Sequence, residues 1–138
     1  MSKDRHYKIA LAFGCGKESS DLLEQLKDQS PLLITCLSKN SDVDGRVVKW
    51  VADYFHCDYL IIPSSFTESW DIWFDGQIRQ YNNIILKWCK KHGYSFDRLI
   101  IGRLKRDLWE RNLYPKRLVE KIQINQLPSM VYMPYWDL

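Results

Sequence analysis

Residues 14–20, which read GCGKESS, carry the side chains with the clearest capacity for chemistry. Two glycines flank a cysteine, and a lysine, a glutamate and two serines follow at once. Glycine lets a chain turn tightly and approach a ligand closely, and a helix that starts just afterwards presents free N–H groups and a partial positive charge. The segment therefore predicts a backbone cradle for an anion, and phosphate is the natural guest.

Two common phosphate loops match this segment poorly. The Walker loop requires G-x-x-x-x-G-K-[ST], but Leu11 stands at its first glycine and Glu18 at its hydroxyl position. The dinucleotide-binding pattern G-x-G-x-x-G meets Ser19 instead of its third glycine, and residues 36–39 supply no acid for a ribose. An ordinary glycine turn between a strand and a helix is the alternative to any phosphate loop.

The segment resembles the pyrophosphatase loop (PP-loop), S-G-G-x-D-S, of enzymes that split ATP into AMP and pyrophosphate, such as GMP synthetase and NAD synthetase. Gly16, Lys17 and Ser19 match the pattern, and Glu18 matches it in charge. The resemblance implies an ATP pyrophosphatase with the adenine nucleotide alpha-hydrolase-like fold, also called the HUP fold. It also implies Mg²⁺, because phosphates and hard oxygen ligands bind this ion together.

The loop departs from the family pattern at its first two positions. Gly14 replaces the serine, which removes a hydroxyl donor, and Cys15 replaces a glycine, which adds a side chain to the loop. The first hypothesis is therefore an ATP-dependent adenylating enzyme, and the second is a non-catalytic adenine-nucleotide-binding module. A Cys15 nucleophile at the helix N-terminus is a third idea, without a visible base partner.

The order of further motifs is similar to that of 7-cyano-7-deazaguanine synthase, a branch associated with queuosine biosynthesis. Asn82 lies in the segment RQYNNIIL, where that branch has an Arg-Asn pair. Gly102 and Asp107 follow the expected fourth strand, and Tyr114-Pro115 comes after them. The closing MPYWDL resembles the branch's segment after strand five. The lysine and the four-cysteine zinc site that come later in the family have no counterpart here, so we expect no zinc site.

The resemblance assigns roles to individual residues. Lys17, Ser19 and Asp107 would be catalytic, and Glu18 and Asp107 would lie near Mg²⁺. The acceptor would be a small acid or a deazaguanine-like base precursor. The adenine would rest against main-chain atoms at the end of the second strand. The full set expected to bind ATP is Phe13, Gly14, Cys15, Gly16, Lys17, Glu18, Ser19, Ser20, Cys36, Leu37 and Gly102.

Short apolar runs alternate with helical patterns along the whole chain. The expected strands are 7–13, 32–37, 59–62, 98–102 and 130–133. The expected helices run from 19 or 20 to 29, from 76 to 92 and from 115 to 124, and one more carries Val47, Val48, Val51, Tyr54 and Phe55. This alternation predicts one α/β domain over residues 1–138, doubly wound around a five-stranded parallel sheet.

Composition limits the class of protein further. The net charge of +3 is compatible with phosphorylated ligands and does not by itself imply nucleic acid. The basic run 105–117 is either a solvated face or an anion-binding edge. None of the four cysteines forms a Cys-x-x-Cys pair, and Cys57 and Cys89 lie in apolar contexts typical of core residues.

The same features predict a cytoplasmic protein with reduced thiols and no membrane span. His6, His56 and His92 show no spacing of a triad or a metal site, and we assign them no chemistry. The sequence leaves open whether the chain forms a homo-oligomer and whether it contacts nucleic acid.

Overall fold

A five-stranded sheet forms the centre of the molecule. The computed structural model describes residues 4–13, 17–37, 45–63, 77–102, 110, 116–119 and 130–135. The strands are β1 (Arg5–Ala12), β2 (Leu32–Leu37), β3 (Tyr59–Pro63), β4 (Tyr94–Ile101) and β5 (Val131–Tyr132). Their order is β3-β2-β1-β4-β5, and every pairing is parallel. The prediction of a five-stranded parallel sheet is confirmed.

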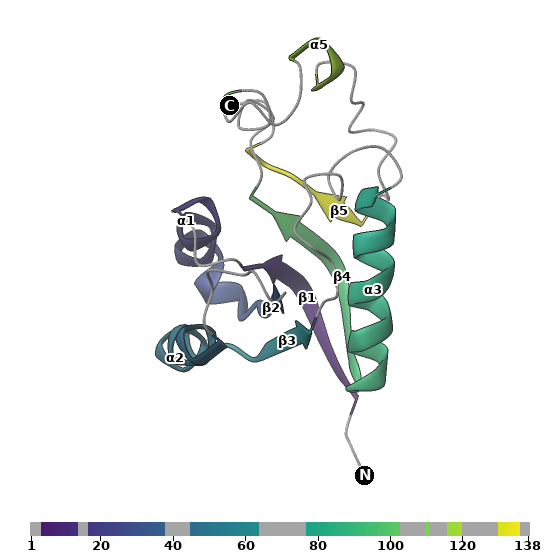
Figure 1. Cartoon of the computed structure of the whole chain (residues 1–138). Helices are drawn as coiled ribbons and strands as arrows, with labels where there is room; N and C mark the ends of the chain where they lie inside the picture. The colour runs from purple at the N-terminus through teal and green to yellow at the C-terminus, as the bar shows by residue number, and fades with distance from the viewer. Residues whose placement is uncertain are drawn as a thin grey trace.

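Helices cover both faces of this sheet (Figure 1). The helices are α1 (Lys17–Leu26), which continues into the 3₁₀ turn η1 (Lys27–Gln29), α2 (Gly45–Phe55), α3 (Gln77–Lys91) and the short α5 (Lys116–Val119). In the parts of the chain that the structure describes, no helix is long and apolar enough to cross a membrane.

Two apolar clusters hold the helices onto the sheet. On one face, Leu22 and Leu23 of α1 and Val48 of α2 pack against strand residues that include Leu11 and Leu33. On the other face, α3 packs against a second set of strand residues, and the buried members of that cluster include Ala10, Ile34, Ile85, Cys89 and Leu99. Burial of this apolar surface is the main favourable contribution to folding. The chain therefore has helices on both sides of a parallel sheet, as the alternating pattern predicts.

The helices differ from the prediction at their boundaries and in one buried face. Helix α2 buries Val48 and Ala52, whereas Val47 and Tyr54 are exposed. Two of the five apolar residues that predicted this helix therefore lie off its buried face, because the positions that meet the sheet are 48, 51, 52 and 55. Helix α3 ends as expected before Gly93, whose φ of 76° lies in the left-handed region that glycine adopts without strain.

Strands β1 and β4 are longer than the apolar runs that predicted them. Strand β4 begins at Tyr94, four residues before the expected start at 98, and β1 begins at Arg5 rather than at residue 7. The added residues pair with one another in register, Arg5 with Tyr94 and His6 with Ser95. Strand β2 joins β1 only from Ala10 onward, so the amino-terminal halves of β1 and β4 form a two-stranded ribbon that extends beyond β2.

Candidate functional site

The strand order places the carboxyl ends of β1 and β4 side by side. From β1 the chain proceeds to β2 and then β3 in one direction, and β4 lies on the opposite side of β1. Ala12 and Ile101, the last residues of β1 and β4, are partners in the ladder. In open α/β sheets the crevice at such a reversal of strand order is the usual ligand site. The segments that follow β1 and β4, which carry the predicted loop and Gly102, therefore start from neighbouring points.

A buried hydrogen bond fixes the point at which the chain leaves β1. The Phe13 N–H donates to the Ile34 carbonyl at 2.8 Å, which extends the β1–β2 pairing by one residue. The Thr35 hydroxyl donates to the Phe13 carbonyl at 2.6 Å, and both side chains are at most 3% exposed. Because a buried carbonyl without a partner is costly, this bond stabilises one direction of the chain immediately before residue 14.

Helix α1 begins at Lys17, two or three residues before the start at 19 or 20 that the serines predicted. Ser19 and Ser20 therefore lie in the first turn of the helix and do not cap it from outside. The first N–H groups of a helix have no partner within the helix, and the helix dipole adds partial positive charge at the same end. Ser19 is buried and Ser20 is exposed. Residues 17–20 of the predicted set therefore form the first turn of α1.

The remaining described members of the predicted set lie at the same edge of the sheet. Cys36 and Leu37 are half-buried at the carboxyl end of β2, where they pair with Ile62 and Pro63. Gly102 directly follows β4 and is also half-buried. The structure therefore brings the carboxyl ends of β1, β2 and β4 and the start of α1 to one edge of the sheet, the carboxyl edge. Gly14, Cys15, Gly16 and Asp107 lie outside the described residues.

Two features of this region were missed in the sequence. Thr35 is the one polar residue of the buried run LLITCL, and its position inside an apolar strand was a usable signal for a buried hydrogen bond. Tyr135, which follows β5 in the segment MPYWDL, accepts a hydrogen bond from Gln25 Nε2 at 2.8 Å. Tyr135 also packs against the cluster under α1 and α2. The segment after β5 therefore contacts α1, the helix that follows β1. It does so although β4 lies between β5 and β1 in the sheet.

Asn82 of α3 is buried, with 3% of its surface exposed. Its Nδ2 donates to the Met130 sulfur at 3.4 Å, and Met130 lies just before β5. Among the residues that the structure describes, Asn82 Oδ1 has no hydrogen-bond partner. This side chain therefore connects α3 to the start of β5 within the core.

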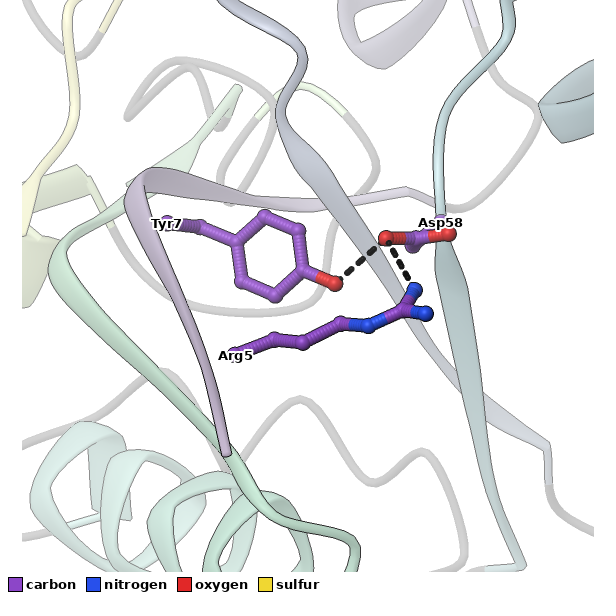
Figure 2. A network of polar contacts seen from close by, with 3 residues as sticks. All are labelled: Arg5, Tyr7 and Asp58. Atoms are coloured by element: carbon purple, nitrogen blue, oxygen red, sulfur yellow. Dashed lines mark hydrogen bonds and ion pairs between the residues drawn. The ribbon is translucent and has the colours of Figure 1, made fainter. Parts of the chain in front are cut away.

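The amino-terminal ends of the strands carry a different kind of polar cluster, which Figure 2 shows. The Tyr7 hydroxyl donates to Asp58 Oδ2 at 2.5 Å, and Arg5 Nη1 lies 3.2 Å from the same oxygen. Partial burial of the phenol, together with this hydrogen bond, raises the pKa of Tyr7 well above its usual value of 10. Asp58 lies just before β3. The cluster therefore links β1 to the start of β3 at the end of the sheet where β2 has not yet begun to pair with β1.

Two of the cysteines lie inside the core of the described part of the chain. Cys57 and Cys89 are buried, as the sequence predicts, and burial raises the pKa of the Cys89 thiol to about 11. Burial raises the pKa of Cys57 in the same direction. Within the described ranges, no three His, Cys, Asp or Glu side chains are grouped to hold a metal ion. Protonated, buried thiols are poor nucleophiles and poor metal ligands, so both are core residues.

Comparisons of the chain with family models, curated proteins and solved structures found no match. The class that the fold defines is an α/β domain with a parallel sheet and helices on both faces. Any narrower assignment depends on the residues at the carboxyl edge.

Proposed function

We propose that this chain is an ATP-dependent adenylating enzyme of the PP-loop type, which converts ATP to AMP and pyrophosphate. The observation that carries the proposal is the pairing of Ala12 with Ile101, because the segments after β1 and β4 then start from neighbouring points. These are the two segments in which the sequence resembles the PP-loop family. The start of α1 at Lys17 supports it further, because the partial positive charge at a helix N-terminus suits a pyrophosphate.

The residues at this edge suit the substrate in their chemistry. Main-chain N–H groups of residues 15–20, the Lys17 ammonium and the Ser19 hydroxyl are the proposed donors to the phosphate oxygens. The proposed carboxylates for Mg²⁺ are Glu18 and Asp107, which are the hard oxygen ligands that this ion prefers. Main-chain atoms of Cys36 and Leu37, at the neighbouring end of β2, are the proposed contacts of the adenine.

The proposed reaction is nucleotidyl transfer to an oxygen of a small acid or a deazaguanine-like precursor. The acceptor oxygen attacks the α-phosphorus of ATP, and pyrophosphate leaves. The contributions of the protein are positioning and charge neutralisation, which dominate catalysis of such transfers. Buried Thr35 contributes indirectly, because its hydrogen bond to the Phe13 carbonyl holds the chain at the residue before the loop. Within this proposal the fold is of the adenine nucleotide alpha-hydrolase type, and the setting is the cytoplasm.

Calorimetric titration with Mg-ATP tests binding. We expect Lys17→Ala to weaken ATP binding by about tenfold to a hundredfold, the size of one lost charge-assisted hydrogen bond. Lys27→Ala is the matched control, because Lys27 is an exposed lysine paired with Glu24 at 2.6 Å on the same helical segment. Its affinity should equal that of the wild type. If the wild-type chain binds no adenine nucleotide at millimolar concentration, the proposal is wrong.

A second candidate function, a nucleotide-binding module without catalysis, is favoured by Gly14 and Cys15. These residues replace the serine and the glycine of the family loop. Pyrophosphate release separates the two candidates when the protein is incubated with ATP, Mg²⁺ and candidate acids, including 7-carboxy-7-deazaguanine. Release above the protein-free rate supports the enzyme, whereas ATP binding without release supports the module. A Cys15→Gly variant that gains release would identify this side chain as the obstacle.

A further inference from the structure

A serine, a histidine and an aspartate lie together at the amino-terminal end of β1 and β4. Ser95 Oγ is 2.7 Å from His6 Nδ1, and Asp97 Oδ1 is 2.9 Å from His6 Nε2. No spacing in the sequence indicates this set, because His6 lies 89 positions from Ser95 and 91 from Asp97. The strand register brings them together by pairing His6 directly with Ser95. Side chains two residues apart share a strand face, which explains why Asp97 reaches the same ring.

The two hydrogen bonds define one consistent arrangement of protons for the neutral ring. An ionised carboxylate can only accept, so His6 Nε2 must carry the ring proton and donate to Asp97. His6 Nδ1 then has a free lone pair, and the Ser95 hydroxyl must donate to it. This is the relation of nucleophile, general base and orienting carboxylate that activates a serine. The roles of the two ring nitrogens follow from the geometry.

The set is open to solvent. The His6 and Asp97 side chains are 54% and 65% exposed, and Ser95 is also exposed. These residues lie on the ribbon that extends beyond β2, outside the region that α1 and α2 cover. Gly102 lies seven positions after Ser95, which corresponds to about 23 Å along the strand. The set is therefore distinct from the carboxyl edge and does not depend on the proposed nucleotide site.

We propose that Ser95, His6 and Asp97 form a nucleophilic site that accepts acyl groups from small esters. The Ser95 oxygen bonds to the acyl carbon, the bond from that carbon to the leaving alkoxide or phenoxide breaks, and the serine proton moves to His6 Nδ1. Asp97 stabilises the imidazolium that forms, and His6 then gives this proton to the leaving oxygen, which departs as the alcohol or phenol. Water then attacks the acyl-serine, His6 takes and returns a proton, and the acid and the free Ser95 are released.

Covalent labelling of the full chain with diisopropyl fluorophosphate, followed by peptide mapping, tests the site. The expected product is a diisopropylphosphoryl group on Ser95, formed as fluoride leaves and the serine proton moves to His6. Ser30 is the matched internal control, because it is an exposed serine with no histidine bonded to its side chain among the described residues. Faster modification of Ser95 than of Ser30 in the wild-type protein supports the proposal without any variant.

Hydrolysis of p-nitrophenyl acetate supplies the second readout. Ser95→Ala should abolish the serine-linked acetyl intermediate, and His6→Gln should slow its formation by about 10²-fold or more, the usual contribution of a general base. Asp97→Asn should slow it less, whereas Ser30→Ala should leave it unchanged. A merely structural role for the three residues predicts no acetyl-Ser95 and equal labelling of Ser95 and Ser30. Either of those results would overturn the proposal.

Discussion

The two halves of β1 lie along the same partner, β4, but in different surroundings. Residues Ile9, Ala10 and Leu11 of the carboxyl-terminal half are buried between helices, whereas Arg5, His6 and Lys8 of the amino-terminal half are exposed. At the end of the buried half, the Thr35 hydroxyl and the Phe13 carbonyl form a hydrogen bond inside the protein. In the exposed half, side chains form pairs that water also reaches.

This difference separates two kinds of polar arrangement. At the carboxyl edge, buried bonds hold the backbone so that the segments after the strands start from fixed points. At the amino edge, side chains such as Tyr7, Asp58 and Ser95 themselves carry the hydrogen bonds. We therefore expect substitutions in the buried half to alter stability strongly, and substitutions in the exposed half to alter local chemistry more than stability.

The largest expected effect is that of Leu11→Ala. Leu11 is fully buried in the cluster under α1 and α2, so the shortened side chain leaves a cavity. The free energy of unfolding should fall by about 2–5 kcal/mol in urea denaturation. His6→Ala, in the exposed half of the same strand, is the control and should cost less than about 1 kcal/mol. Equal losses in the two variants would contradict the comparison.

Thr35→Val should have an intermediate effect at the carboxyl edge. Valine has nearly the same shape as threonine but cannot donate to the Phe13 carbonyl, which remains buried without that bond. The expected loss of stability is about 1–3 kcal/mol, measured by the same denaturation. Thr35→Ser keeps the hydroxyl and serves as the control. The account also expects Thr35→Val to bind Mg-ATP more weakly than Thr35→Ser does, at a temperature where both are folded.

The smallest effect should come from Tyr7→Phe at the amino edge. This variant loses the bond to the partly exposed Asp58 and should cost about 1 kcal/mol near neutral pH. The pKa of Tyr7 is higher in the folded state than in the unfolded state. The stability that the protonated phenol adds is therefore complete below pH 10 and declines as the pH rises further. The difference in the free energy of unfolding between the wild type and Tyr7→Phe should therefore shrink above pH 10. Urea denaturation between pH 7 and 11 measures this difference, and an advantage that stays constant with pH would contradict the assigned cause.

Much of the fold could be predicted because buried parallel strands are short apolar runs. The run 32–37 predicted the bounds of β2 correctly, and the carboxyl ends of β1 and β4 were each predicted within one residue. The amino-terminal extensions of β1 and β4 were not predicted, because Arg5, His6 and Ser95 are polar and pair only through long-range register. The cluster of His6, Ser95 and Asp97 was invisible for the same reason.

The candidate nucleotide site was only partly predictable. The glycines and the lysine of GCGKESS indicated a turn into a helix, and the structure starts α1 at Lys17. The serines suggested a cap and predicted a start two or three residues too late, because serine also occurs inside the first turn of a helix. The buried bond of Thr35 needed knowledge of which strands are neighbours. The roles of the loop residues and of Asp107 stay predictions.

Hydrogen–deuterium exchange of the full chain, with and without millimolar Mg-ATP, tests the central claim most directly. The account predicts slower amide exchange in peptides that cover residues 13–20, 35–37 and 101–103, with no change in peptides that cover 5–8 and 94–97. Exchange that stays unchanged at the carboxyl edge under saturating Mg-ATP, or protection confined to the amino-terminal ribbon, would contradict the claim that the carboxyl ends of β1, β2 and β4 form the nucleotide site.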